Sequence, residues 1–440
     1  MAPGLQFNPI GWTTSNAARL DPLAVLRHQC IHLFWFNPAA DAIQLVAVHS
    51  QGEAMNENAD ILVVGGGLVG QIAAVSLARL GHDVVHLAPD APEDRRTSAL
   101  MQPAIEFLEQ RGLLDDPASI GHRLARVRII DATDRLLRAP ETLFDASEGG
   151  GDAFGWNIPN AALLAHLKTI AAGTARLSAH ADALAGLHVS DTGVEAVTES
   201  GRRFAAALVV GADGKRSPVR SAGGFRSRET VYKQSALVCD LELERGLGET
   251  SVEFHYHNGP FTLVPAGGKR ANLVYIDLAE PLAEIRALPA EMQAERFASR
   301  AHNLFGRMEV LTPTAVFPLS SLTVPEAGKD GMVLVGEAAH AFPPIGAQGL
   351  NLGLRDVADL VDFVAEADTT QAAWGRKLSE RFSARRFGDL TRTGLVVDGL
   401  FRSLLSEHLP AQMARSAGLW ALRSLPGLRK QAFSIGMGRR

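Results

Sequence analysis

The stretch that decides the fold is residues 60–90, which read DILVVGGGLVGQIAAVSLARLGHDVVHLAPD. An apolar run at 61–64 ends in a glycine turn, apolar residues then recur at helical spacing up to Gly81, and a second apolar run follows at 84–87. This order predicts a strand, a tight turn, a helix and a second strand. The turn matches G-x-G-x-x-G at Gly65, Gly67 and Gly70, which between strand and helix is typical of dinucleotide binding.

Each glycine of this turn has its own physical role. Gly65 permits the tight turn, Gly67 lets the backbone approach a pyrophosphate, and Gly70 lets the helix pack closely on the sheet. The helix amides then face the phosphates. A glycine-rich strand turn without a ligand is the weaker alternative, because both strands and the helix are in place. The unit alone leaves NAD and FAD equally open.

Composition describes a globular protein of two or three domains. The 440 residues are 46% apolar and 21% charged, and the net charge of -5 argues against a general nucleic-acid binder. With only two cysteines, Cys30 and Cys239, neither a disulfide framework nor a metal site is expected. No run of eighteen apolar residues occurs, so we expect a cytoplasmic protein without a membrane span.

The two ends of the chain differ from the rest. Residues 1–54 carry no clear periodicity and precede Met55, so we expect 1–58 to be a disordered extension or the product of a start assigned too far upstream; a targeting segment is less favoured. Residues 371–440 hold 13 Lys and Arg against 4 Asp and Glu. That surplus fits either a solvated helical face or contact with anionic lipid.

The region after the second strand alternates helices and strands. Arg96 precedes a helix that stops near Gly112; strand-like pieces follow at 128–137 and 151–158, and then a helix at 160–172. Short alternating runs over 187–210 predict a hairpin that ends in Gly-Ala-Asp-Gly at 211–214. An Asp-Gly pair is ordinarily a turn, but behind a buried strand of an α/β fold it is placed to meet a ligand.

Four strand candidates, 236–243, 251–256, 261–264 and 273–278, then follow without an intervening helix. Strands grouped in this way predict a mainly antiparallel sheet inserted into the nucleotide domain, with a helical cover at 281–301. The apolar residues of this sheet could line a substrate channel, although ordinary core is the better reading for any one of them. They are Val238, Leu241, Phe254, Phe261, Leu263 and Val264.

A third ligand-loop signal spans residues 331–353. A buried strand opens into Gly336-Glu337, then the rigid Pro343-Pro344, then a glycine turn before a helix at 350–364, whose free amides suit a negatively charged group. His340 could be a catalytic base, but we favour a packed, hydrogen-bonded support. Residues 372–433 are expected to be helical, with an apolar face for packing.

Three motifs in one order, at 65–70, 211–214 and 336–351, resemble the class A flavoprotein aromatic hydroxylases, and specifically the ubiquinone-biosynthesis hydroxylase family. The segments 380–389, 397–401 and 415–419 look like that family's C-terminal pattern, so the resemblance covers roughly 57–440. It implies a Rossmann-like FAD domain (59–126, 156–231, 313–370), an inserted, mainly antiparallel substrate domain (127–155, 232–312) and a C-terminal helical region (371–440).

The resemblance also implies site residues. Arg96, Pro343 and Pro344 would position flavin and substrate, with no side-chain base assigned. The FAD contacts would come from the three loops, Asp90 and Arg96; the loop residues are Gly65, Gly67, Leu68, Val69, Gly70, Asp213, Gly214, Gly336, Glu337, Gly346, Ala347, Gln348, Gly349, Leu350 and Asn351.

Two positions depart from the family pattern. The ribose-binding Glu at the end of the second strand is Ala88 here, with Asp90 two residues later, and the Asp after Gly336 is Glu337. Either Asp90 reaches back to the adenosine ribose, or backbone and water hold it with some loss of FAD affinity.

By resemblance, the activity is hydroxylation of an aromatic ring, most simply a polyprenylated phenol of ubiquinone biosynthesis, with NAD(P)H and O2 through a flavin C4a-hydroperoxide. The alternatives are a hydroxylase of a small soluble phenol, a prenyl-chain reductase, and a flavin-binding protein without turnover. Expected partners include the inner face of the membrane, met through the basic tail, and other enzymes of quinone biosynthesis; nucleic acid is not expected.

Overall fold

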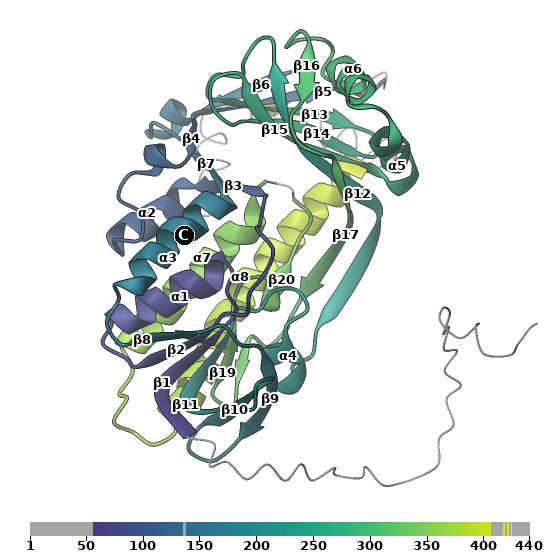
Figure 1. Cartoon of the computed structure of the whole chain (residues 1–440). Helices are drawn as coiled ribbons and strands as arrows, with labels where there is room; N and C mark the ends of the chain where they lie inside the picture. The colour runs from purple at the N-terminus through teal and green to yellow at the C-terminus, as the bar shows by residue number, and fades with distance from the viewer. Residues whose placement is uncertain are drawn as a thin grey trace, which may run out of the picture. The chain divides into compact units, whose positions relative to one another are not determined.

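The computed structural model describes residues 56–134, 138–344, 346–405, 417–418, 420–421 and 424 (Figure 1). The predictions made for residues 1–55 and for the end of the C-terminal helical region lie outside these residues. Figure 1 shows a lower part built on one sheet, which holds the predicted nucleotide-binding unit, and a second sheet above it, joined by strands and by a long helix.

The predicted unit at 60–90 is confirmed as β1 (Asn56–Val64), α1 (Leu68–Arg79) and β2 (Val84–Leu87), with β1 and β2 parallel. β1 is buried on both faces, because Ile61 and Val63 pack under the helices while Leu62 and Val64 join a second cluster on the other face. A strand buried on both faces reads as a continuous apolar run, which is why it was recognisable.

Around β1 lies an eight-stranded sheet. Six of its strands have the order β18-β19-β11-β1-β2-β8, from β18 (Gly328–Lys329) and β19 (Met332–Leu334) through β11 (Arg203–Gly211) to β8 (Leu177–His180). The expected hairpin over 187–210 is in fact three strands, β9 (Leu184–Val189), β10 (Val194–Thr198) and β11. The other two strands of the sheet, β9 and β10, branch from β11, to which β10 pairs, with β9 beside β10. α3 (Asn160–Ala172) has the bounds expected from sequence and, with α7 (Gln348–Ala365), packs against α1.

The second sheet has nine strands in the order β20-β17-β12-β15-β14-β13-β5-β6, with β16 (Met308–Val310) beside β12. It is mainly antiparallel, as predicted, and only β13 and β5 run parallel. The remaining strands are β5 (Arg126–Asp131), β6 (Thr142–Asp145), β12 (Arg228–Leu243), β13 (Thr250–Tyr256), β14 (Gly259–Pro265), β15 (Arg270–Leu278), β17 (Ala315–Thr323) and β20 (His340–Ala341).

One face of this sheet is covered by two helices, α5 (Ala279–Ala287) and α6 (Ala290–Arg300), where sequence predicted one helical cover. Pro289 separates them, since proline lacks the amide that a continuous helix needs. The opposite face is turned toward the nucleotide-binding part (Figure 1). Strand pairing also places β17 along β12, although residues 313–370 were expected in the FAD domain; the domain boundaries as a whole stay a prediction.

Between the two large sheets lies a three-stranded sheet, β3 (Thr97–Met101), β7 (Gly155–Pro159) and β4 (His122–Leu124). The segment after Arg96 therefore forms a strand before it enters α2 (Gln102–Gln110). β3 and β7 pair antiparallel, and this small sheet lies between the eight-stranded and the nine-stranded sheet.

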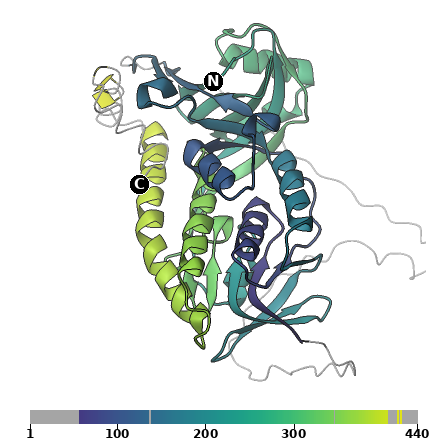
Figure 2. The same ribbon diagram turned by 90° about the vertical axis from the view of Figure 1, so that its left-hand side faces the viewer.

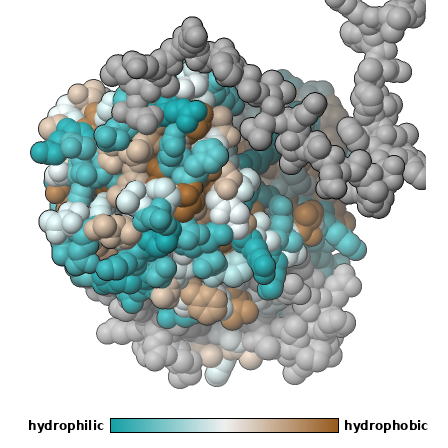
Figure 3. Space-filling view, turned by 90° about the horizontal axis from the view of Figure 1, so that it is seen from below, coloured by the Kyte–Doolittle hydropathy of each residue, from teal (hydrophilic) through white to brown (hydrophobic). Residues whose placement is uncertain are grey.

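The long helix α8 (Trp374–Leu405) lies beside α7 (Figure 2). Among the described residues, no helix is long and apolar enough to cross a bilayer. Seen from below, the described surface mixes hydrophilic residues with scattered apolar ones (Figure 3).

Candidate active site

The glycine turn after β1 has the geometry that each glycine was expected to provide. Gly65 has φ +125°, and a Cβ there would lie 2.2 Å from the Ala212 carbonyl oxygen. A Cβ on Gly70 would lie 1.9 Å from the Gly65 carbonyl oxygen, so only glycine allows α1 to start this close to β1. Gly67 differs, since a Cβ there meets no atom within 4 Å. The space beside Gly67 is open to a ligand.

α1 begins at Leu68 without a side-chain cap on Gly67, so the amides of its first turn have no intrahelical acceptor. Below the turn, the buried His86 of β2 makes a 2.9 Å hydrogen bond through Nε2 with the Gly65 carbonyl oxygen. Burial lowers the pKa of His86, so the imidazole is neutral and donates to that carbonyl. Sequence reasoning missed this support; the signal was one polar residue in an otherwise apolar strand.

The Asp-Gly loop that follows β11 touches the glycine turn, through the contact of Gly65 with Ala212. In this loop, one carboxylate oxygen of Asp213 accepts a 2.8 Å hydrogen bond from the Val219 amide, while Oδ1 is buried without a partner. Burial raises the pKa of Asp213 above its ordinary value. A buried carboxylate oxygen without a donor beside an open turn fits a ligand that brings a hydroxyl.

The third motif joins the same cluster. Gly336 has φ +60°, and a Cβ there would lie 3.1 Å from a Val69 methyl group; a Cβ on Gly353 of α7 would lie 3.0 Å from Val69. The start of α1, the turn at Gly336 and the body of α7 are therefore in close contact, and all three predicted motifs come together.

The start of α7 is the second uncapped helix end of the site. Its N-cap, Ala347, has the left-handed φ of +54°, a strained conformation for alanine that is often found at functional sites. Asn351 accepts a 2.8 Å hydrogen bond from the Met101 amide and donates to the carbonyl oxygens of Ala99 (2.8 Å) and Ala347 (2.6 Å). The Asn351 side chain is thus already used to fasten α7 to β3.

Arg96 lies at the mouth of this cluster. Asp94 accepts two 2.8 Å hydrogen bonds from it and a third from Asn160, while Glu337 lies 3.7 Å from its Nη1. The bonds to Asp94 raise the pKa of Arg96; burial acts to raise the pKa of Asp94, but its bonds from Arg96 and Asn160 outweigh burial and lower it. Arg96 therefore stays positively charged, and the Glu337 carboxylate lies beside its guanidinium.

His340 is a support, as favoured from sequence. It is buried, and its Nε2 lies 2.6 Å from Asp356 Oδ2, which also accepts a 2.8 Å hydrogen bond from the Gly336 amide. Behind Asp356 lies the fully buried Arg386 of α8, 2.5 Å from Asp356, 2.8 Å from Asp359 and 2.7 Å from Asp389.

Burial alone would raise the pKa of Asp356, but the charge of Arg386 and the bonds from His340 and Gly336 outweigh it and lower the pKa. This ion cluster ties the Gly336 turn to α8. It was not predicted, because Asp356 and Arg386 read as the polar faces of two amphipathic helices.

Three further predicted residues lie at the margin. Pro343 is buried and Pro344 exposed, in the loop between β20 and α7. Asp90 is exposed, and among the described residues no hydrogen bond joins it to the glycine turn.

The predicted channel lining divides between the two faces of the nine-stranded sheet. Leu241, Phe254, Phe261 and Leu263 belong to the core under α5 and α6, which confirms the core reading for them. Val238 and Val264 are half-buried, at the positions that alternate with this core face.

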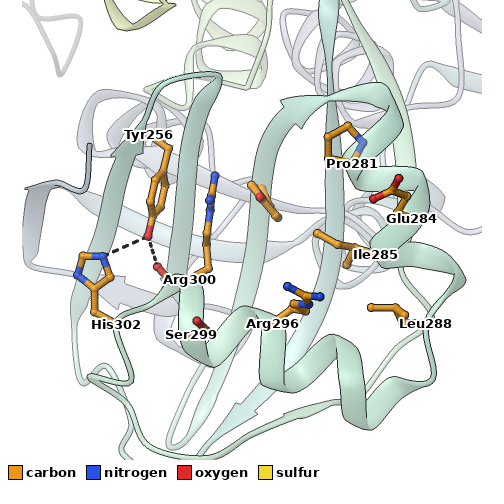
Figure 4. A pocket seen from close by; sticks show the side chains of 10 residues that line it. Tyr256, Pro281, Glu284, Ile285, Leu288, Arg296, Ser299, Arg300 and His302 are labelled. Carbon is orange, nitrogen blue, oxygen red and sulfur yellow. Dashed lines mark hydrogen bonds between the residues drawn. The ribbon is translucent and has the colours of Figure 1, made fainter. Parts of the chain in front are cut away.

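A separate pocket of about 550 Å³ lies between α5, α6 and the core face of the sheet (Figure 4). Three of its polar residues are paired. The Arg300 guanidinium stacks 3.6 Å above the Tyr256 ring and lies 3.3 Å from Asp277, and the Tyr256 hydroxyl donates to the Arg300 carbonyl oxygen and lies 3.3 Å from His302. None of the predicted site residues lines it.

Taken together, the site offers two uncapped helix starts, open glycine positions and a buried carboxylate oxygen without a donor. Helix starts bind phosphate and other anionic groups, and the carboxylate suits a hydroxyl. The arrangement fits a dinucleotide with an anionic centre and hydroxyls, as FAD has. Among the described residues, no cluster of His, Cys, Asp and Glu is suited to a metal.

Comparisons with known proteins agree with this geometry. The family described as "FAD binding domain" matches residues 58–386. The chain is similar to the ubiquinone hydroxylase UbiL of Rhodospirillum rubrum, with 30% identity over 392 residues, 86% of this chain and 90% of the relative. It is also similar to the 3-demethoxyubiquinol 3-hydroxylase of Escherichia coli, with 30% identity over 405 residues, 87% of this chain and 99% of the relative.

Solved structures show the same fold. The p-nitrophenol 4-monooxygenase PnpA of Pseudomonas putida matches with a TM-score of 0.70 and 20% identity, over 88% of this chain and all of that one. PqsL of Pseudomonas aeruginosa, described as a probable FAD-dependent monooxygenase, matches with a TM-score of 0.71 and 22% identity, over 83% of this chain and all of that one. The predicted aromatic-hydroxylase fold is confirmed.

Proposed function

The chain belongs to the FAD-dependent hydroxylases of ubiquinone biosynthesis, and from this premise we propose which of its residues hold FAD and which substrate they serve. It is an FAD-dependent monooxygenase that uses NAD(P)H and O2 to hydroxylate the ring of a ubiquinone precursor. The observation that carries the residue assignment is the convergence of three loops, at Gly65–Gly70, Asp213 and Gly336, on two uncapped helix starts.

When bound, FAD accepts a hydride from NAD(P)H and activates O2 for transfer of one oxygen atom to the ring. In our proposal the amides of Leu68 and Val69, beside the open Gly67, hold the diphosphate, and Asp213 accepts a hydrogen bond from a hydroxyl of the cofactor. Arg96 stands at the mouth of the site, where Asp94 and Glu337 keep its guanidinium in place.

The start of α7 would meet the ring end of the cofactor. The amides of Gln348, Gly349 and Leu350 are free to stabilise negative charge there. Asn351 acts through position, because its amide is fastened to β3, and Pro343 with Pro344 would limit the approach of water from the loop side. Asp90 and the backbone at Ala88 remain the groups nearest in sequence for the adenosine ribose.

For the finer identity of the substrate we propose a polyprenylated phenol taken from a membrane surface. An exposed stripe on α8 supports this: Arg385, Arg392, Leu395 and Val396 are exposed and fall on one side of the helix at spacings of seven and ten to eleven residues. Basic and apolar residues together on one helical face suit an anionic lipid surface.

Purified protein tests the proposal. We expect a yellow preparation whose NAD(P)H oxidation is stimulated by a phenolic ubiquinone precursor and which yields a product heavier by one oxygen. Stimulation by small phenols alone would favour the soluble-phenol hydroxylase, saturation of a prenyl chain would favour the reductase, and FAD binding without turnover would favour the binding protein.

Membrane contact needs a milder variant than deletion of residues 371–440, because that deletion would remove the buried Arg386. We expect the double variant L395E/V396E to keep its FAD and to lose flotation with anionic vesicles. Equal flotation of variant and wild type would contradict the membrane proposal and leave the hydroxylase untouched.

A further inference from the structure

Asp240 of β12 is a carboxylate on the face of the nine-stranded sheet that α5 and α6 leave uncovered. It is half-buried; its directly opposed residue on this face is Asn272, and its apolar neighbours there are the half-buried Val238, Val264 and Val274. Among the described residues no cationic side chain lies within 4 Å of it. A carboxylate on a half-buried, largely apolar face is unfavourable unless donors reach it.

The other carboxylates on this face are accounted for differently. Glu253 of β13 lies 3.2 Å from His255, its neighbour two residues on, and so has a partner. Glu242, two residues beyond Asp240 on the same side of β12, is exposed and therefore solvated. Asp131 of β5, also half-buried, accepts hydrogen bonds from Thr133 and from the Ala139 amide. Among the described residues, Asp240 thus combines partial burial with the lack of a paired cation.

Two hydrogen-bonded asparagine side chains, a string of side-chain amides, hold the Asp240 carboxylate in one orientation. Asn272 of β15 donates a 2.6 Å hydrogen bond to Asp240 Oδ1, and the buried Asn157 of β7 donates a 2.7 Å hydrogen bond to Asn272 Oδ1. Asn157 also donates to the Pro265 carbonyl oxygen at 3.0 Å. Within the part of the chain that the structure describes, Asp240 Oδ2 has no hydrogen-bond donor, so it can accept a further hydrogen bond.

The string leads to the start of α7. Asn157 pairs directly with Ala99 in the β3–β7 ladder, and the Ala99 carbonyl oxygen accepts the 2.8 Å bond from Asn351 in the first turn of α7. Residues opposite each other in an antiparallel pair have Cα atoms about 5 Å apart. The amide string and the helix start that would meet the flavin ring are thus neighbours through one strand.

We propose that Asp240 is a specificity-determining residue that accepts the hydrogen bond of the substrate's phenolic hydroxyl, with Asn272 and Asn157 fixing the carboxylate. This inference rests on the proposed function and names the substrate class more closely. An ionised carboxylate only accepts, so it requires a ligand that donates. The site therefore selects neutral phenols over ring acids, because the charge of Asp240 repels a carboxylate carried by the same ring.

The phenol is selected over its methyl ether because the ether has no hydroxyl to donate to Asp240. A substrate whose hydroxyl is methylated leaves the carboxylate without its donor, which a hydrogen-bonding site penalises strongly. The apolar valines around Asp240 then hold the ring without distinguishing the two compounds.

The test uses full-length protein loaded with FAD and three probes: a short-chain 2-alkylphenol, its methyl ether, and the 4-hydroxybenzoate that carries the same alkyl group. We expect wild type to turn over the phenol in preference to both other compounds. D240N should retain FAD and NAD(P)H-dependent flavin reduction, raise KM for the phenol by about tenfold to a hundredfold, and lose the preference over the methyl ether.

E242Q is the matched control, because it removes the same charge two residues away on the same strand face, and it should leave KM unchanged. N272A, which frees the carboxylate without removing it, should give a smaller rise in KM than D240N. An unchanged KM and preference in D240N, with normal FAD content, would overturn the assignment. Failure of wild type to hydroxylate any phenol would instead overturn the proposed function.

Discussion

Replacing Arg386 with Met should destabilise the protein strongly, although Arg386 lies outside the three ligand-loop motifs. Its guanidinium is fully buried and lies within 2.8 Å of Asp356, Asp359 and Asp389. Removing one partner of a buried ion pair leaves the other charge in a medium that cannot solvate it, which destabilises proteins by about 3–5 kcal/mol. Here three carboxylates lose a shared cation, so we expect a loss at the upper end of that range.

The adjacent Arg385 provides the control. Its side chain is 54% exposed and its Nε lies 3.9 Å from Asp359, so R385M should lower the free energy of unfolding by no more than about 1 kcal/mol. Both variants remove one positive charge from α8, and they differ in burial. Urea denaturation followed by circular dichroism measures the difference.

The pH dependence adds a second test. The folded pKa of Asp356 is lowered, so its contribution to stability is present above its unfolded pKa, near 3.9, and is lost as pH falls through the folded pKa. R386M lacks the part of this contribution that comes from the charge of Arg386. The stability gap between wild type and R386M should therefore narrow as pH falls below about 4. A loss in R386M no larger than in R385M, or a gap that widens in acid, would refute the reasoning.

Four further variants probe the loops. G67A should fold with normal stability but bind FAD more weakly, because its methyl group enters the open space beside the turn. G70A places its Cβ 1.9 Å from the Gly65 carbonyl oxygen, so it should fail to bind FAD and lose thermal stability. Equal behaviour of the two variants in FAD titration and thermal melting would contradict these roles. H86L leaves that buried carbonyl without its donor and should lower the free energy of unfolding by about 1–3 kcal/mol; a smaller loss in urea denaturation would show that the bond is dispensable. D213N should weaken FAD binding by about tenfold, since the carboxylate is replaced by a weaker neutral acceptor; unchanged affinity in fluorescence titration would count against contact between Asp213 and FAD.

Sequence revealed those parts of the fold that repeat a local pattern. The strand–turn–helix unit at 60–90 was recognisable because β1 is apolar on both faces and α1 has helical periodicity. The hairpin expected over 187–210 was less accurate, because three short strands with polar turns show the same alternation as two longer ones. The partner strand of β17 could not be predicted, since strand alternation carries no information about it.

The supports of the site could not be found in this way, because they depend on contacts between residues far apart in sequence. His86 and Gly65 are 21 residues apart, and Asn351 reaches β3 across 252 residues. Arg386 looked like a solvated charge on a basic helix, yet it is the buried centre of three aspartates. Polarity alone does not distinguish these two environments.

The replacement of the family's Asp by Glu337 also depends on contacts that sequence does not show. Glu337 is one methylene longer than the Asp of the family pattern, and its carboxylate lies 3.7 Å from Arg96. The Gly336 amide is held by Asp356 instead, so the turn keeps its shape whichever acid follows the glycine. The longer side chain is therefore free to lie beside Arg96, while the cluster around Asp356 and Arg386 holds the turn.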